Sequence, residues 1–323
     1  MSLNTVEVHE VALVDPDAGE ITARSPLQLF WRRFRKDRVA ITALGFIVAL
    51  IVAALAAPLI IKALNLQPLN VPNTAELDAF GQPSGPSSVH PLGVDELGRD
   101  ILARIIYGAR VSLEVAFIST GLAVFFGVIV GTLAGFLGGW LDTALSRIMD
   151  VVLAFPILLL AIGLSSACTL GNGCLGGLIN PGRTTLIFVI ALSSWPYIGR
   201  IIRGQVLSLR EKEFVEASRS IGASDGRIMR REILPNLVAP IIVYSSLVLP
   251  TNILYEAALS FLGVGVQPPT ASWGQMIATA APIFDSAWWY MLFPGIALVA
   301  TVLAFNLVGD GLQDALDPRS TNK

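Results

Sequence analysis

The sequence is poor in charge, in histidine and in cysteine. Only 14% of its 323 residues are charged, whereas a soluble globular domain carries about 25%. This deficit, together with 54% hydrophobic residues and a mean hydropathy of +0.67, predicts a membrane protein. The two histidines, His9 and His90, stand in polar segments without ligand partners at metal spacing, so we expect no metal site.

Motifs for catalysis and nucleotide binding are also missing. The sequence has no Walker A pattern, no HExxH helix and no GxSxG elbow. Ion-coupled carriers place ionisable residues at mid-membrane depth, but here such residues fall near the ends of the apolar segments: Glu114, Asp150, Arg200 and Glu256. We therefore expect neither an enzyme nor an ion-coupled carrier, and no cofactor in this chain. Its energy source is expected to be a partner.

Six apolar segments predict an all-α membrane protein with six transmembrane helices, because about 20 apolar residues cross a bilayer. The segments are Val39–Ile61, Val111–Gly138, Val151–Ala167, Thr184–Ile202, Leu237–Leu259 and Trp288–Val308. The first is longer than the apolar region of a signal peptide, which has about 7–15 residues, so we expect it to be retained.

The segments between and around the spans differ in character. Residues 1–25 are polar and acidic, which predicts a disordered tail. Residues 26–38 are basic and aromatic, which favours either an interfacial helix anchored by Trp31 and Phe34 or a plain positive flank for the first span. We expect a long extracytoplasmic loop over 62–110, a short polar turn from Trp140 to Asp150, a permease core over 111–308 and a polar tail over 309–323.

The distribution of Lys and Arg predicts the orientation. If both termini lie inside, the inner segments hold 17 of these residues and the outer segments hold 5. This excess follows the positive-inside rule. We therefore expect cytoplasmic termini, a cytoplasmic segment over 203–236 and a location in the cytoplasmic membrane.

Small residues recur every four positions in the second span. They are Ser119, Ala123, Gly127, Gly131, Gly135 and Gly139. This spacing places them on one helical face, where small side chains let a second helix approach closely.

The only cysteines, Cys168 and Cys174, fall in a short outer hairpin under this topology. Disulfides persist outside the cytoplasm, so we predict a bridge that pins the hairpin. The alternative is two small hydrophobic residues at the membrane edge.

The charged segment 203–236 is predicted to form a protruding pair of helices. A first helix is expected over Gly204–Ile221, ended by a left-handed Gly222. Ser224 and Asp225 are suited to cap a second helix that ends at Pro235. Three residues are small enough for this pair to sit in a groove of another protein: Ala217, Ser218 and Ala223.

The order Glu216-Ala-Ser-x-x-x-Gly222, followed by Ile-Leu-Pro235, resembles the EAA loop of bacterial ABC importer permeases. The third residue of that motif is usually Ala, and here it is Ser218. The resemblance implies that residues 203–236, hereafter the EAA loop, carry a coupling helix that inserts into an ATP-binding subunit. The residues it assigns to this coupling are Glu216, Ala217, Ser218, Gly222, Ala223 and Pro235.

Two further stretches resemble dipeptide/oligopeptide permeases of the DppC/OppC type. One runs from His90 to Asp100 (HPLGVDELGRD), with Val94 where that family commonly has Thr, and continues at Ile106–Leu113. The other is LSFLGVGVQPP at Leu259–Pro269 with Ser272-Trp-Gly.

This resemblance implies a type I ABC importer permease fold and a multi-subunit assembly. The expected partners are a second homologous permease, two cytoplasmic ATP-binding subunits that hold ATP and Mg, an extracytoplasmic substrate-binding protein and membrane lipid, with no nucleic acid. The expected cargo is a di- or oligopeptide. Nickel complexes, heme, glutathione and sugars remain open, because similar permeases serve several cargoes.

Two assignments within the chain also stay open. Trp195 and Pro196 either form a gate on the substrate path or pack against a neighbouring helix. Arg99 and Asp100 either contact the substrate-binding protein or form local ion pairs.

Overall fold

The computed structural model describes residues 26–64, 66, 69–170, 174, 177–179 and 182–316. The acidic tail predicted over 1–25 and the end of the polar tail, 317–323, lie outside the described residues.

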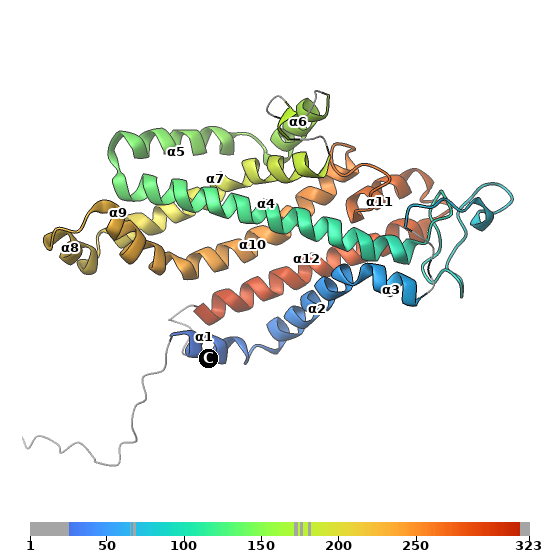
Figure 1. Ribbon diagram of the computed structural model, residues 1–323, viewed down its shortest axis with the longest axis horizontal. Coiled ribbons are helices and arrows are strands. Elements are labelled where there is room, and N and C mark those ends of the chain that lie inside the picture. Colours follow the sequence, from blue (N-terminus) through green and yellow to red (C-terminus); the bar gives the residue numbers. More distant parts are fainter. Residues whose placement is uncertain are drawn as a thin grey trace, which may run out of the picture.

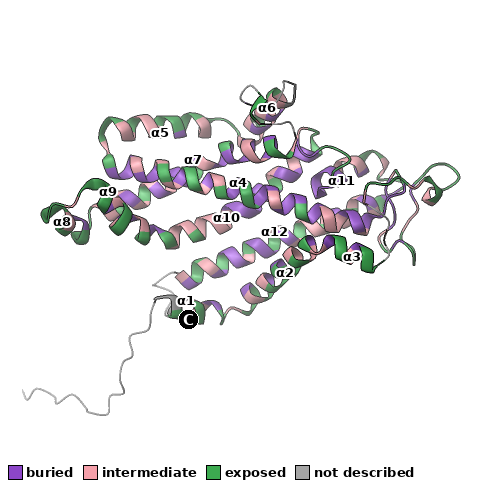
Figure 2. Ribbon diagram, viewed as in Figure 1, coloured by how far each residue is buried: buried purple, intermediate pink, exposed green. Residues whose placement is uncertain are grey.

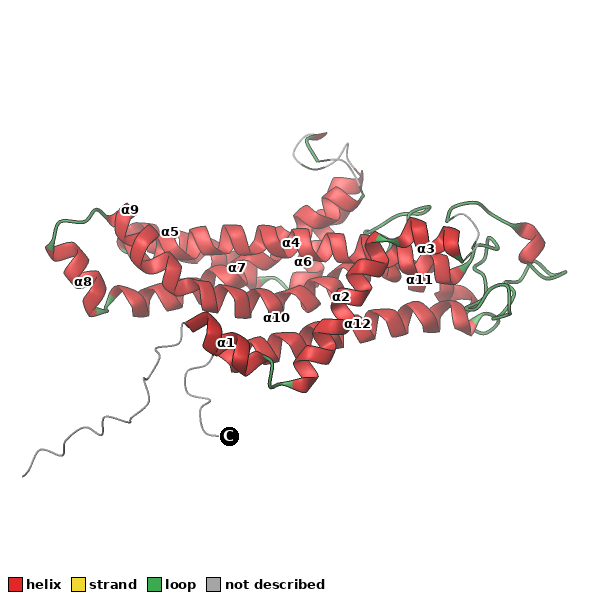
Figure 3. Cartoon of the chain, turned by 60° about the horizontal axis from the view of Figure 1, so that its bottom comes forward, coloured by secondary structure: helices red, strands yellow, loops and turns green. Residues whose placement is uncertain are grey.

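Long helices make up most of the described chain (Figure 3). Five of them run side by side along the long axis of the molecule (Figure 1) and are long and apolar enough to cross a membrane. They are α2 (Arg38–Leu55), α4 (Ile101–Leu137), α7 (Arg183–Arg210), α10 (Leu234–Phe261) and α12 (Trp288–Leu316). A bent pair, α5 (Gly139–Ala154) and α6 (Ile157–Leu170), brings the number of candidate spans to six.

The third span is not the straight helix predicted over Val151–Ala167. Helices α5 and α6 meet at 89°, because Pro156 lacks a backbone N–H and disfavours helical dihedrals in the preceding residue. Phe155 is accordingly extended, with φ −86° and ψ 139°. The polar turn predicted from Trp140 to Asp150 is also wrong, since these residues are helical. The turn lies earlier, where Gly138 has φ +69°.

Other helix bounds differ from the apolar segments as well. Helix α4 begins at Ile101, so the last part of the loop predicted over 62–110 is helical; the Asp100 carboxylate accepts a hydrogen bond from the Ala103 N–H at 2.8 Å and caps this helix. Helix α12 continues to Leu316, so the beginning of the predicted tail is also helical. Polar residues at both places extend a helix beyond its apolar part.

The first span is broken near its end. A single non-helical residue, Ala56, separates α2 from α3 (Ala57–Ala63), and Pro58 lies in the first turn of α3, where its missing N–H costs no helical hydrogen bond. Before it, α1 (Pro26–Phe34) packs against α12. Phe34 is buried in the core, so its predicted role as a lipid anchor is wrong, whereas Trp31 is exposed.

Helices α4 and α7 form the most extensive helix pair, and buried residues follow their contact (Figure 2). A Cβ atom at Gly131 would lie 2.5 Å from the Gly199 carbonyl oxygen, and one at Gly135 would lie 2.8 Å from the Arg203 carbonyl oxygen. The predicted small-residue face therefore permits the close backbone contact. Gly139 is not part of it, because α4 has already ended and nothing lies near this residue.

The helices leave two polar ends. At one end lie α8 (Glu213–Ser220) and α9 (Asp225–Ile228), which we call the α8 end; at the other lie α11 (Trp273–Ala280) and the long loop before α4, which we call the α11 end (Figure 1). Short 3-10 turns at Thr74–Glu76 and Ala281–Ile283 belong to the α11 end.

Candidate functional site

The EAA loop connects α7 to α10 at the α8 end. The single helix predicted over Gly204–Ile221 is wrong, because α7 stops at Arg210 and α8 starts at Glu213. Between them Lys212 is extended, with φ −86° and ψ 146°. This break turns the chain so that Val215 is fully buried against the core of the α8 end.

A glycine turn ends α8. Gly222 has φ +82°, a conformation that side chains rarely adopt. The Gly222 N–H donates to the Arg219 carbonyl at 2.9 Å, and the Ala223 N–H donates to the Ser218 carbonyl at 3.1 Å. These two bonds form a Schellman motif. The turn predicted at Gly222 thus has a defined geometry.

The second helix of the loop does not end at Pro235, as predicted, but continues into the membrane span. Ser224 stands at the N-cap position of α9, although its side chain makes no capping hydrogen bond. A π-helical turn, Met229–Ile233, joins α9 to α10. Pro235 lies in the first turn of α10, where a proline is tolerated. This part of the loop is therefore continuous with α10.

Most of the residues predicted for coupling are accessible at the α8 end. Glu216, Ala217, Gly222 and Pro235 are exposed, and Ser218 and Ala223 are half-buried. Beside Gly222, the apolar Ile221 side chain is 84% exposed. Phe214 on α8 is also exposed, and exposed apolar side chains on a protruding helix are typical of a surface that contacts another protein.

The base of the loop is fastened to α4 by residues that sequence reasoning missed. The Arg210 Nη1 atom donates to the carbonyl oxygens of Gly135 and Phe136 at 3.4 and 3.3 Å. The Arg219 guanidinium lies 5.5 Å from the centre of the Phe136 ring, a cation–π distance. The loop and the end of α4 are thus joined by several independent contacts.

Polar side chains also join the spans at greater depth. The Asn252 Nδ2 atom on α10 donates to Thr120 Oγ1 on α4 at 2.8 Å, and Ser194 Oγ on α7 donates to Asn252 Oδ1 at 3.0 Å. One turn further along α10, Glu256 is fully buried and accepts a hydrogen bond from Ser260 at 2.9 Å. Glu256 is therefore an interior residue of the bundle, although it falls near a span end in the sequence.

The structure favours helix packing for the predicted gate residues. Pro196 is buried within α7 and Trp195 is half-buried. Near Pro196, Tyr197 and Arg200 are exposed polar residues of α7, and the Arg200 guanidinium contacts Asp150 on α5 at 2.5 Å. Sequence reasoning placed Asp150 and Arg200 at span edges without pairing them.

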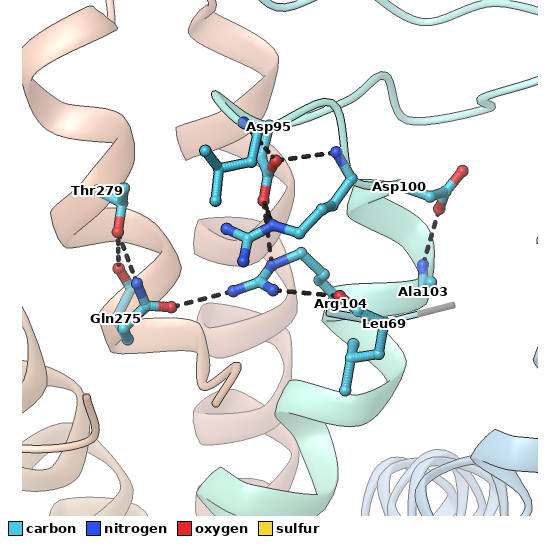
Figure 4. A network of polar contacts seen from close by, with 9 residues as sticks. Leu69, Asp95, Asp100, Ala103, Arg104, Gln275 and Thr279 are labelled. Atoms are coloured by element: carbon cyan, nitrogen blue, oxygen red, sulfur yellow. Dashed lines mark hydrogen bonds and ion pairs between the residues drawn. The ribbon is translucent and has the colours of Figure 1, made fainter. Parts of the chain in front are cut away.

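At the α11 end, buried charges order the loop before α4 (Figure 4). Asp95 is fully buried and accepts from the Arg99 Nε atom at 2.7 Å, and its Oδ2 atom lies 3.3 Å from the Arg104 Nε atom. Gln275 on α11 lies 3.4 Å from the Arg104 guanidinium. Burial raises the pKa of the neighbouring Glu96 carboxyl, and the charge of Asp95 raises this pKa further.

The second carboxylate of this motif, Asp100, is buried as well. It contacts the His90 ring at 2.8 Å, and His90 lies 3.3 Å from Glu76. Arg99 and Asp100 are thus both engaged in local ion pairs, which favours that alternative over contact with another protein.

We expect Asp95→Ala to destabilise the fold by about 3–5 kcal/mol, because it leaves two buried guanidinium groups without their shared carboxylate. Thermal unfolding of the purified chain measures this. The control is Asp285→Ala, which removes an exposed carboxylate from the same end of the molecule. Equal unfolding temperatures for both variants would contradict the role given to Asp95.

The two cysteines are bonded in the structure. Cys168 and Cys174 form a disulfide with their Cα atoms 4.6 Å apart. It joins the last turn of α6 to Cys174, whose backbone N–H donates to the Ile179 carbonyl at 3.0 Å.

Apolar helices of membrane-spanning length define an integral membrane protein, and the protruding loop that connects α7 to α10 is fastened to α4. The chain belongs to the family of binding-protein-dependent transport system inner membrane components, which matches residues 127–322. The N-terminal transmembrane domain of oligopeptide transport permease C matches residues 25–72. The chain is therefore an inner-membrane permease of the ABC importer class with the type I fold, a class of subunits that are not themselves enzymes.

Named relatives are similar over nearly the whole chain. The dipeptide transport system permease protein DppC of Alkalihalophilus pseudofirmus is 40% identical over 304 residues, which cover 94% of this chain and 93% of that protein. The glutathione transport system permease protein GsiD of Escherichia coli O6:K15:H31 is 41% identical over 316 residues, which cover 97% and 95%.

A solved structure shares the fold. The inward-facing MetNI methionine ABC transporter aligns with a TM-score of 0.56 at 21% identity, covering 67% of this chain and 98% of that one. At this identity the similarity concerns the fold alone.

Proposed function

We propose that the chain is the permease subunit of an importer that moves di- and oligopeptides across the cytoplasmic membrane. ATP hydrolysis by partner subunits would drive it through the EAA loop. The observation that carries this proposal is the exposed α8–Gly222 surface fastened to α4 through Arg210 and Arg219. Such a surface receives a displacement from outside and passes it to the membrane helices.

The proposed assembly contains a second homologous permease, two ATP-binding subunits that hold ATP and Mg, and an extracytoplasmic substrate-binding protein. Membership of the importer family supports ATP-binding and substrate-binding partners in general. This chain then lines half of the path. The exposed polar residues Tyr197 and Arg200 on α7 make that face the best candidate for the lining.

We place the α8 end in the cytoplasm. The Lys and Arg count supports this orientation, and the Cys168–Cys174 disulfide, which begins in the last turn of α6, then lies outside, where such bonds persist. ATP is available only on the side that this orientation gives to the EAA loop.

Two steps connect the proposed docking surface to the path. A displacement of α8 pulls on α4 through the Arg219–Phe136 contact and on α7 through the short connection at Lys212. The Asn252 hydrogen bonds then link α4, α7 and α10, so the three helices move together.

The cargo is tested by transport into vesicles that hold the complete purified importer. The relatives are named as dipeptide and glutathione permeases, and glutathione is itself a modified tripeptide. We therefore expect radiolabelled short peptides to enter the vesicles in an ATP-dependent manner. Selective uptake of glutathione would favour the second candidate. Uptake of a nickel complex, heme or a sugar, with no peptide uptake, would refute the peptide assignment.

We expect a cysteine at Ser220 to crosslink to an ATP-binding subunit, since Ser220 is an exposed residue of α8. A bifunctional thiol reagent applied to the assembled complex, followed by mass spectrometry of the adduct, makes the measurement. The control is Phe80→Cys, a site that is 89% exposed at the α11 end. A crosslink from position 80 but not from 220 would overturn the orientation.

A further inference from the structure

An apolar groove lies between α4 and the start of α10. It has a volume of about 620 Å³. Its lining residues come from two stretches of the chain, one in α4 and one that runs from α9 to the start of α10. They are Gly121, Val124, Phe125, Val128, Ile129, Thr132, Leu133, Gly226, Met229, Arg230 and Leu234. One charged residue, Arg230, stands among these side chains.

A basic pocket continues from this groove. It is lined by Ser224, Gly226, Arg227, Arg230 and Arg231 and shares Gly226 and Arg230 with the apolar groove. The three arginines are exposed. The described residues offer them no ion pair, in contrast to Arg200 and Arg203, which pair with carboxylates of α5.

The groove opens on the apolar side of the bundle. The outward residues of α4 beside it, Phe125, Phe126 and Ile129, are 58%, 49% and 41% exposed. The groove lining on α4 between Gly121 and Leu133 has one polar side chain, Thr132, and it is buried. A span face that exposes only large apolar side chains is suited to lipid rather than to an aqueous path.

We propose that this groove and pocket bind one anionic phospholipid. The phosphate contacts Arg227, Arg230 and Arg231, and an acyl chain lies along α4 between Phe125 and Leu133. Basic pockets between membrane helices near the cytoplasmic surface bind anionic head groups, and guanidinium groups suit phosphate well. Both halves of such a lipid, the charged head group and the apolar chain, find complementary surfaces that meet at Arg230.

The location gives the lipid a functional consequence. It lies between α4 and the helix that leads from the EAA loop into α10. A lipid held there fills the space between these two helices, both of which contact the loop. The proposal itself concerns binding and does not depend on which cargo the importer carries.

The head-group part of the proposal is tested by measuring how much lipid the purified full chain retains in detergent. Phosphatidylglycerol and phosphatidylcholine are added separately, and bound lipid is counted by native mass spectrometry. We expect retention of phosphatidylglycerol only. The affinity for phosphatidylglycerol is expected to fall about fivefold in Arg230→Gln. In the double variant that also carries Arg231→Gln, it is expected to fall by about a further fivefold. The charge-matched control is Lys212→Gln, an exposed cation of the same loop outside the pocket.

The acyl-chain half is tested by filling the groove. No atom lies within 4 Å of a Cβ placed on Gly121, so Gly121→Leu enters the groove without a backbone clash. We expect reduced retention of phosphatidylglycerol at an unchanged unfolding temperature. The control is Gly45→Leu on α2, which is equally free of neighbours.

Three results would overturn the proposal. Equal retention of both lipids would show that charge does not select the occupant. Unchanged retention in the double arginine variant would remove the phosphate site. Displacement of the bound lipid by millimolar inorganic phosphate would show a simple anion site in place of a lipid site.

Discussion

Replacing Gly222 by valine is expected to reduce coupled transport strongly while the permease stays folded in the membrane. Gly222 has φ +82° and nothing lies within 4 Å of its position, so the obstacle to a side chain is the backbone conformation and not space. A β-branched residue there costs of order 1–3 kcal/mol. The chain relieves this strain by opening the turn, which changes the angle between α8 and α9.

The effect is specific to coupling because Gly222 itself is exposed and contacts no core side chain. A coupling free energy of a few kcal/mol corresponds to a change of about 5–150-fold, so we expect ATP-dependent import to fall within that range. Import and ATP hydrolysis are measured on the purified mutant complex in vesicles, with unfolding temperature as the measure of fold.

Two variants serve as controls for Gly222→Val. Gly222→Asn retains a residue that tolerates the left-handed conformation, and we expect it to keep most of the import activity. Gly204→Ala changes a helical glycine of the same loop that has open space around it, and it is expected to be neutral. Wild-type import and hydrolysis in the valine variant would show that the turn does not carry the docking surface.

The number of spans was predictable because bilayer thickness imposes a length on every apolar segment. The shape of the third span was not. Pro156 is visible in the sequence, but proline within an apolar run marks either a mild kink or a full break. Which one occurs depends on what the flanking residues contact. Here Arg203 on α7 pairs with Asp142 at 2.5 and 2.7 Å and holds α5 as a separate helix.

The candidate site was likewise predictable only in part. Gly222 was found because a left-handed turn has a local signature in residue type. The fastening of the loop was not found, because Arg210 and the Phe136 carbonyl are 74 positions apart, and the Asn252–Thr120 bond joins residues 132 positions apart. Nothing in the sequence around an arginine near a helix end indicates which distant residue it contacts. The lipid-anchor prediction for Phe34 was also wrong, because this aromatic residue of a basic segment packs into the core.

Gly131→Val is expected to have the largest effect on folding of any single change considered for the spans. Its Cβ atom would lie 2.5 Å from the Gly199 carbonyl oxygen, 3.0 Å from the Ile202 Cβ atom and 3.1 Å from the Arg203 N atom. Two of these three neighbours are backbone atoms of α7 and cannot rotate away. Helices α4 and α7 must therefore separate, at a cost at or above the upper end of the roughly 1–3 kcal/mol typical of overpacking.

Separation of α4 from α7 has a consequence beyond lower stability. Gly127 and Gly135 lie on the same face at the same contact, so the whole close-packed length opens, and the Arg210 hydrogen bonds to the end of α4 are lost with it. The loop would then no longer move α4. We expect a lowered unfolding temperature, and in any folded fraction ATP hydrolysis without import. The control is Gly121→Val, in the same helix but with no atom within 4 Å. Similar unfolding temperatures for the two variants would show that the α4–α7 contact yields more easily than its backbone distances imply.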